Sequence, residues 1–264
     1  MLGAIFGDIV GSVYEWKNLK TKDFPLLGQY NRITDDSVMT LAVARALTDF
    51  DKRGGTEAFK ETLIDTMHAL GNQYPNAGYG FQFRRWLRER SRAPYNSFGN
   101  GSAMRVSPVA WYADTLEEAL AYAKASAEIT HNHPEGIKGA VCTAGAVFLA
   151  RKGADKAEIL DFITQYYDLD FTLDELRPIY GFDATCQGSL APAMRAFIEA
   201  TGFEDTIRNA ISLGGDSDTL AAIAGAVAEA YFGMTEKEER IVLTYLTPNL
   251  RKIVMDFSTM LATR

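Results

Sequence analysis

Apolar residues recur three and four positions apart along almost the whole chain, and this periodicity constrains the fold more than any other feature. The period-two alternation that marks half-buried strands is scarce. The periodicity predicts helices near 3–16, 35–50, 56–70, 102–112, 116–129, 135–151, 156–167, 186–200, 204–212, 218–232 and 236–262. We therefore expect an all-α fold.

Local start and stop signals agree with these helices. Capping boxes, in which a Thr and a Glu three residues later satisfy free backbone N–H groups, pair Thr115 with Glu118, Thr172 with Glu175 and Thr235 with Glu238. Glycines that tolerate the left-handed C-cap conformation stand where helices should end, at Gly54, Gly55, Gly71, Gly153, Gly202 and Gly233. No repeat or low-complexity linker divides the chain, which predicts a single domain over residues 1–264.

Composition narrows the class of protein. The chain has 264 residues, of which 47% are hydrophobic and 23% are charged, and this is enough material to bury a substantial core. Its formal net charge of −7 disfavours a long phosphate-binding surface, so we expect no extended nucleic-acid interface. A single nucleotide is compatible with that charge. The length and charge also permit a monomer.

Cysteine usage and hydropathy indicate a compartment. Cys142 and Cys186 lack the spacing of metal ligands or of a redox pair, so we interpret them as core thiols of a cytoplasmic protein. The apolar start of the chain is interrupted by Asp8 and has no preceding Lys or Arg, unlike a signal peptide. The most apolar segment, 219–232, contains Glu229, and we expect no membrane span.

Two acidic tetrads stand where long helices of small residues should begin. They read Thr-Asp-Asp-Ser at 34–37 and Asp-Ser-Asp-Thr at 216–219. A helix start favours anions because its free N–H groups and its dipole carry partial positive charge. If the fold brings the tetrads together, their carboxylates repel one another unless cations neutralise them. Oxygen ligands without thiols or a His pair suit Mg2+, Mn2+ or Ca2+.

A glycine-rich stretch is a candidate binding loop for a diphosphate. Gly-Asn-Gly-Ser at 99–102 precedes Met104 and Arg105, and free backbone N–H groups before a helix can bind an anion. An ordinary turn with a helix cap would have the same sequence. Arg105 is poorly placed for the helix dipole, which predicts a carboxylate partner for it.

Histidines and aromatic residues give weaker signals. Thr-His-Asn-His-Pro at 130–134 lies at an expected helix break, and its histidines are too close in sequence to share a helix face as a zinc pair. His131 either contacts substrate or is a neutral ring bonded to backbone at a helix junction. Aromatic residues at 74, 79, 81 and 83 could stack on adenine or fill the core, so adenine recognition has no assignment.

Taken together, these motifs resemble those of the ADP-ribosylglycohydrolases, which include enzymes that activate dinitrogenase reductase. The matching segments are Gly7-Asp8, 12–15, 34–37, 100–105, 130–131 and 214–219, and they extend over essentially the whole chain. The resemblance implies a compact, orthogonal multi-helix bundle with two Mg2+ or Mn2+ ions in a central cleft. It also implies hydrolysis of the N- or O-glycosidic bond between ADP-ribose and an acceptor.

The resemblance assigns roles to particular residues. The family's metal ligands correspond to Thr34, Asp35, Asp36, Asp216, Asp218 and Thr219. We predict substrate contacts at Asn100, Gly101, Ser102 and Met104 and, by analogy, at His131. Glu15 is expected near the site as a gate or an acid/base group, and a solvated charge at a helix end is the alternative. Asp36 or Asp218 could relay a proton.

A ribosyl bond breaks through an oxocarbenium-like transition state, so catalysis needs an oriented ribose, a water and a proton for the leaving group. A metal-dependent ADP-ribosyl hydrolase is therefore the leading hypothesis, with an ADP-ribosylated protein, nucleobase or small molecule as partner. Its alternatives are a non-catalytic ADP-ribose-binding or crystallin-like structural relative, and a two-metal hydrolase of phosphoesters. Both tetrads are whole, which favours turnover. The sequence carries no readable signal for the acceptor.

Overall fold

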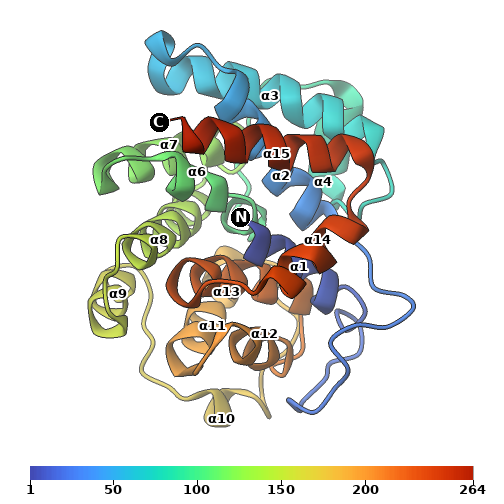
Figure 1. Ribbon diagram of the computed structural model, residues 1–264, viewed down its shortest axis with the longest axis vertical. Helices are drawn as coiled ribbons and strands as arrows, with labels where there is room; N and C mark the ends of the chain where they lie inside the picture. The colour runs from blue at the N-terminus through green and yellow to red at the C-terminus, as the bar shows by residue number, and fades with distance from the viewer. Residues whose placement is uncertain (264) are drawn as a thin grey trace.

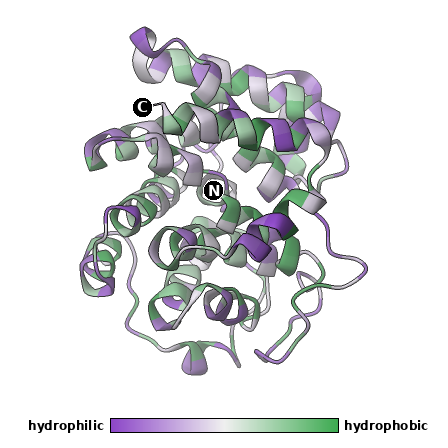
Figure 2. Cartoon of the chain, in the orientation of Figure 1, coloured by the Kyte–Doolittle hydropathy of each residue, from purple (hydrophilic) through white to green (hydrophobic). Residues whose placement is uncertain are grey.

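Every regular element in the computed structural model, which describes residues 1–263, is a helix (Figure 1). Besides the helices, this range contains one isolated β-bridge, between Gly99 and Thr185. The prediction of an all-α fold is confirmed. Buried residues from nearly all the helices form one hydrophobic core, whereas hydrophilic turns lie on peripheral helices such as α10 and α14 (Figure 2).

The helices are best followed from the centre of the molecule outward. At the centre, α1 (Leu2–Gly11) packs along α13 (Ser217–Phe232), which also contacts α11 (Cys186–Glu199) and α12 (Phe203–Ile211). Helix α2 (Asp35–Asp49) packs against α15 (Pro248–Ala262) and against α3 (Gly55–Gln73), which follows the 3-10 turn η1 (Lys52–Gly54). Helix α8 (Pro134–Arg151) contacts α5 (Gly101–Met104), α6 (Ser107–Tyr112), α7 (Leu116–Glu128) and α9 (Lys156–Ile163). Outermost, α4 (Phe81–Glu89) lies on α3, α10 (Leu173–Leu176) on α11 and α14 (Glu236–Tyr245) on α1.

Glycines one helical turn apart allow α1 to approach α13 closely. A Cβ atom on Gly7 would lie 2.1 Å from the carbonyl oxygen of Ala221, and one on Gly11 would lie 2.4 Å from the Cα of Asp218. These distances leave room for hydrogen only, so the helices pack backbone to backbone. The crossing brings the end of α1 against the start of α13, where the second acidic tetrad lies.

Several predicted boundaries were wrong. The predicted helix at 102–112 is two helices, because Pro108 lacks the N–H that a continuous helix would need there. The predicted helix at 236–262 breaks after Tyr245, where Thr247 caps a new helix that begins at Pro248. The predicted helix at 3–16 ends at Gly11.

Some turn signals were also misread. Gly71 lies inside α3, and Gly202 precedes α12 as its N-cap, so neither ends a helix. Helix α4 was missed, although Phe83, Trp86 and Leu87 give it a buried face at helical spacing. None of the described helices is long and apolar enough to cross a membrane.

Candidate active site

A cavity of about 670 Å³ opens where α2 and α13 begin, a size that suits a nucleotide-sized ligand. Every predicted metal ligand lines it, namely Thr34, Asp35, Asp36, Asp216, Asp218 and Thr219. Glu15, Asn100, Gly101, Met104 and His131 line it as well. The fold therefore gathers all but one of the predicted site residues, the exception being Ser102, around one cavity.

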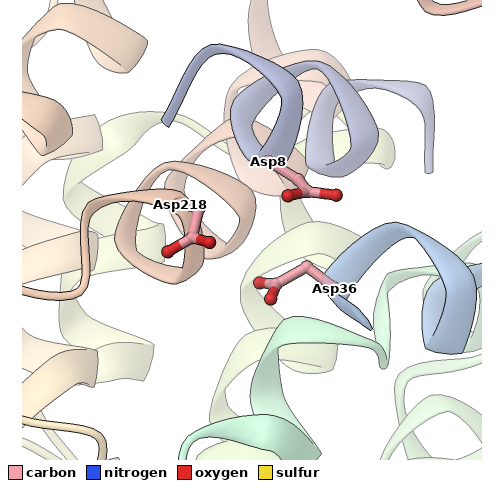
Figure 3. A group of neighbouring side chains, drawn as sticks. All are labelled: Asp8, Asp36 and Asp218. Atoms are coloured by element: carbon pink, nitrogen blue, oxygen red, sulfur yellow. The ribbon is translucent and has the colours of Figure 1, made fainter. Parts of the chain in front are cut away.

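Carboxylates at the cavity wall, together with the fully buried Asp8 behind it, form two overlapping groups. Oxygen atoms of Asp8, Asp36 and Asp218 lie within 4.8 Å of one another, and oxygen atoms of Glu15, Asp216 and Asp218 do the same. Figure 3 shows the first group, whose side chains extend from α1, α2 and α13 toward a common centre. Asp218 belongs to both groups and thus links them.

Burial and mutual repulsion raise the pKa of these carboxyl groups. Burial raises the pKa of Asp36 and of Asp218 well above the usual range, and the neighbouring acids raise it further. Burial and the charge of Asp8 raise the pKa of Asp35 to about 7. The pKa of Asp216 and that of Glu15 are raised by burial too. Without a cation, the site therefore retains protons that a bound divalent ion would displace.

The residues present fit a hard divalent cation. Asp36 Oδ1 is buried and has no hydrogen-bond partner within residues 1–263, although an orphaned buried oxygen is costly. Thr34 Oγ1 donates its proton to Asp8 Oδ1 at 2.7 Å and accepts a hydrogen bond from Asp36 N at 3.3 Å, so its second lone pair is available to a cation. The donors are all oxygens, which Mg2+, Mn2+ and Ca2+ prefer.

Asp8 is a site residue to which the sequence analysis gave no role. Its carboxylate accepts hydrogen bonds from Thr34 N at 2.8 Å, from Thr34 Oγ1, from Ser37 N at 3.1 Å and from Ser37 Oγ. It thus joins α1 to the first turn of α2 and orients the Thr34 hydroxyl. The sequence signal that could have identified Asp8 is its place on the glycine-lined face of an apolar helix. A charge buried on such a face needs several hydrogen-bond partners.

The predicted substrate residues divide into those facing the cavity and those behind it. Ser102 Oγ is fully buried, donates to the carbonyl of Gly136 at 2.7 Å and does not line the cavity, so its side chain is not placed to meet a ligand. Asn100 Nδ2 donates to Asp216 Oδ2 at 2.7 Å, so this amide supports a predicted metal ligand. Gly101 lies against the ring of His131.

The expected carboxylate partner of Arg105 is absent from the part of the chain that the structure describes. Arg105 is fully buried and donates to the carbonyl of Ser126 and to Thr130 Oγ1 instead. It is a rare buried cation without a compensating acid.

Within residues 1–263, four exposed aromatic residues line the cavity. The sequence analysis considered only Phe81 among them, as a candidate to stack on adenine. They are Trp16, Phe81, Phe98 and Phe182. Trp16 and Phe182 stack with ring centroids 5.1 Å apart and an interplanar angle of 13°. Of the other candidates, Tyr79 is buried in the core and does not line the cavity, so the core-filling alternative holds for it, whereas Phe83 is buried and also lines the cavity.

Comparison with known proteins identifies the family. A family model described as ADP-ribosylglycohydrolase matches residues 1–254. The chain belongs to this family. It is 28% identical to ADP-ribosylhydrolase ARH3 of Bos taurus, over 90% of this chain and 85% of that protein. It is 29% identical to ADP-ribosyl-[dinitrogen reductase] glycohydrolase of Rhodospirillum rubrum, over 78% of this chain and 70% of that protein.

Two further similarities support the assignment. The chain is 26% identical to an ADP-ribosylarginine hydrolase of Pseudomonas putida, over 89% of this chain and 70% of that protein. A solved structure, titled "ADP-ribosylglycohydrolase-related protein complex", shares the fold with a TM-score of 0.70 at 23% identity, over 98% of this chain and 96% of that one. Family members hydrolyse ADP-ribosyl bonds, and the chain is an enzyme of this class.

Proposed function

We propose that the protein releases ADP-ribose from an acceptor by hydrolysing its glycosidic bond, and that two Mg2+ or Mn2+ ions assist. The observation that supports the ions is the position of Asp218, which lines the cavity and belongs to both carboxylate groups. Thr34, Asp35 and Asp36 would hold the ions from α2, and Asp216, Asp218 and Thr219 would hold them from α13. Bound there, divalent ions supply the positive charge that orients ribose hydroxyls and activates water.

Glu15 is placed to carry the proton that the reaction needs. It is half-buried at the cavity wall, and burial together with Asp216 raises its pKa. A carboxyl group at this position can donate a proton to the departing acceptor, and its carboxylate form can then accept a proton from water. Asp36 and Asp218 are the other candidates for proton transfer. All three belong to the carboxylate groups, and Glu15 is the one that is only half-buried.

We assign substrate binding to the cavity wall that the glycine loop at 99–101 forms with His131. The backbone of Gly99 and Gly101 and the ring of His131 lie together there, and Met104 lines the same cavity. We assign the diphosphate of ADP-ribose to this wall. A binding-only role is disfavoured because every predicted metal ligand lines the cavity. The cytoplasmic location and the monomeric state stay predictions.

A panel of ADP-ribosylated acceptors tests the proposal. Arginine-, serine-, nucleobase- and O-acyl-linked ADP-ribose would be incubated with the protein and Mg2+, with and without EDTA, and free ADP-ribose quantified by mass spectrometry. We expect Mg2+-dependent release from at least one acceptor class. Cleavage of the diphosphate would instead support a phosphoester hydrolase, and ADP-ribose binding without release from any acceptor would support a structural relative.

A further inference from the structure

A buried chain of hydrogen bonds runs from Arg105 to His131 behind the glycine loop at 99–101. Arg105 Nη2 donates to Thr130 Oγ1 at 2.9 Å and to the carbonyl oxygen of Ser126 at 2.8 Å. Thr130 Oγ1 lies 2.8 Å from His131 Nδ1. The side chains of Arg105, Thr130 and His131 are all buried, so bulk water does not compete for these bonds.

The donor and acceptor roles in this chain follow from its first member. A guanidinium donates hydrogen bonds and cannot accept them, so Thr130 Oγ1 is the acceptor toward Arg105. The Thr130 hydroxyl proton then needs an acceptor of its own. Across residues 1–263, the one acceptor that this hydroxyl reaches is His131 Nδ1. Nδ1 is therefore the unprotonated ring nitrogen.

The ring as a whole is neutral. Burial lowers the pKa of His131 well below its usual value, and the nearby Arg105 charge lowers it further. A neutral imidazole carries one proton, and with Nδ1 unprotonated that proton lies on Nε2. The tautomer is thus set by Thr130, which is itself oriented by Arg105.

Nε2 is placed at the cavity wall. A Cβ atom on Gly101 would lie 3.2 Å from Nε2, and one on Gly99 would lie 3.6 Å from it, so the two glycines leave this nitrogen uncovered. His131 lines the cavity, and its Nε2 has no hydrogen-bond partner in the described part of the protein. An N–H donor here is available to a ligand.

The Arg105 charge favours an anionic ligand. Burial lowers the pKa of Arg105 to about 10, so it stays protonated at neutral pH. Arg105 also lines the cavity, and its Nε has no partner in the described chain. An uncompensated positive charge in a low-dielectric wall attracts an anion more strongly than it would in water.

We propose that Arg105 and Thr130 are positioning residues that fix His131 as a neutral Nε2–H donor to a phosphate oxygen of the ligand. The choice of ADP-ribose as that ligand rests on the proposed function, whereas the tautomer does not. The sequence predicted a substrate contact for His131 and a carboxylate partner for Arg105. It gave no role to Thr130. The structure assigns them control over which nitrogen carries the proton.

Nitrogen-15 NMR of the imidazole rings tests the tautomer directly. The chain has three histidines, and spectra of the His68→Gln and His133→Gln variants assign the signals of His131 by elimination. We expect Nδ1 at the unprotonated end of its shift range and Nε2 at the protonated end, from pH 6 to pH 8. Thr130→Ser should keep this pattern, and Thr130→Val should shift protonation toward Nδ1. A wild-type ring protonated on Nδ1 would overturn the inference even if the valine variant failed to fold.

Binding measurements test the consequence for the ligand. In calorimetric titrations, Thr130→Val should weaken the binding of ADP-ribose about tenfold, which is the loss expected for one hydrogen bond to a charged group. Adenosine, which lacks phosphate, should bind the wild type and this variant equally, and Thr130→Ser should retain wild-type affinity for both probes. Equal loss of adenosine and ADP-ribose would show a merely structural role and refute the proposal. A wild type that binds no ADP-ribose would instead refute the proposed function, whatever the ring state.

Discussion

At the residue scale, the site depends on carboxylates that have different tasks. Asp218 and Asp36 direct oxygens toward the common centre, whereas Asp8 uses both of its oxygens on the hydrogen-bond donors of Thr34 and Ser37. Asp8 therefore acts mainly by orienting α2, although one of its oxygens also lies in the first group. Removing a direct ligand and removing an orienting residue should have effects of different size.

Asp218→Asn should abolish ADP-ribose release because Asp218 belongs to both carboxylate groups. We expect its loss to weaken Mg2+ binding by more than the roughly 10- to 100-fold typical of an outer-shell partner. Isothermal titration with Mg2+ and mass spectrometry of the product would measure both effects. Asp174→Asn, at an exposed position, is the matched control. Wild-type Mg2+ affinity in Asp218→Asn, with the helical circular dichroism unchanged, would contradict the assignment.

Asp8→Asn should weaken Mg2+ binding by roughly 10- to 100-fold and leave a folded protein. The new amide presents an NH2 group to backbone donors that need an acceptor, so the first turn of α2 loses its orientation. Ser37→Ala removes one of the hydrogen bonds on Asp8 and should have a smaller effect. If Asp8→Asn bound Mg2+ as tightly as the wild type, the orienting role would be wrong.

At the element scale, the crossing of α1 and α13 determines the geometry of the site. The glycines of α1 let the two backbones touch, and this contact sets where Asp8 and Asp218 lie relative to each other. The start of α2 then completes the group through its hydrogen bonds to Asp8. A change in helix separation should therefore reach the carboxylates without altering any of them.

Gly7→Ala should destabilise the protein by at least about 2 kcal/mol, because overpacking a rigid contact typically costs about 1–3 kcal/mol and this Cβ would meet backbone. Mg2+ affinity should fall as well, because α1 must move away from α13. Urea unfolding and Mg2+ titration would measure the two effects. Gly181→Ala, whose Cβ would meet open space, should change neither. Unchanged stability in Gly7→Ala would show that the crossing is not tightly packed.

At the scale of the whole molecule, folding concentrates negative charge in one cavity. The folded protein without a cation binds protons there that the unfolded chain has released. Asp35 shows this most directly, because burial and the charge of Asp8 raise its pKa from an ordinary value of 3.8 to about 7 in the fold. Stability from this group is complete below about pH 4 and is lost as the pH rises through 7. A bound divalent ion offsets the loss because it binds only the folded state.

In EDTA, the urea concentration at the unfolding midpoint should therefore be lower at pH 8 than at pH 5. Mg2+ should reduce or reverse this difference. Asp35→Asn should also reduce the fall in EDTA because the titrating group is gone. Fluorescence-monitored unfolding at the two pH values would provide the midpoints. An identical pH dependence with EDTA and with Mg2+ would argue against a cation at the carboxylates.

The sequence by itself determined the class of fold, most of the helices and the candidate residues of the site. Those features are local, because apolar periodicity, helix caps and acidic motifs can each be recognised within a short segment of sequence. The tetrads at 34–37 and 216–219 could be identified in this way, whereas Glu15 and His131 were placed near the site by the family resemblance, and both line the cavity. The family resemblance could be recognised because it rests on short sequence motifs, and the family match confirmed it.

The tertiary structure alone decided which partner each side chain meets. It brought Asp8 into the carboxylate group, turned Ser102 away from the cavity and left Arg105 without an acid. Periodicity shows which face of a helix is buried but not which helix covers it, because that depends on contacts between residues far apart in the chain. The close crossing of α1 and α13 is such a contact, and the site exists because of it.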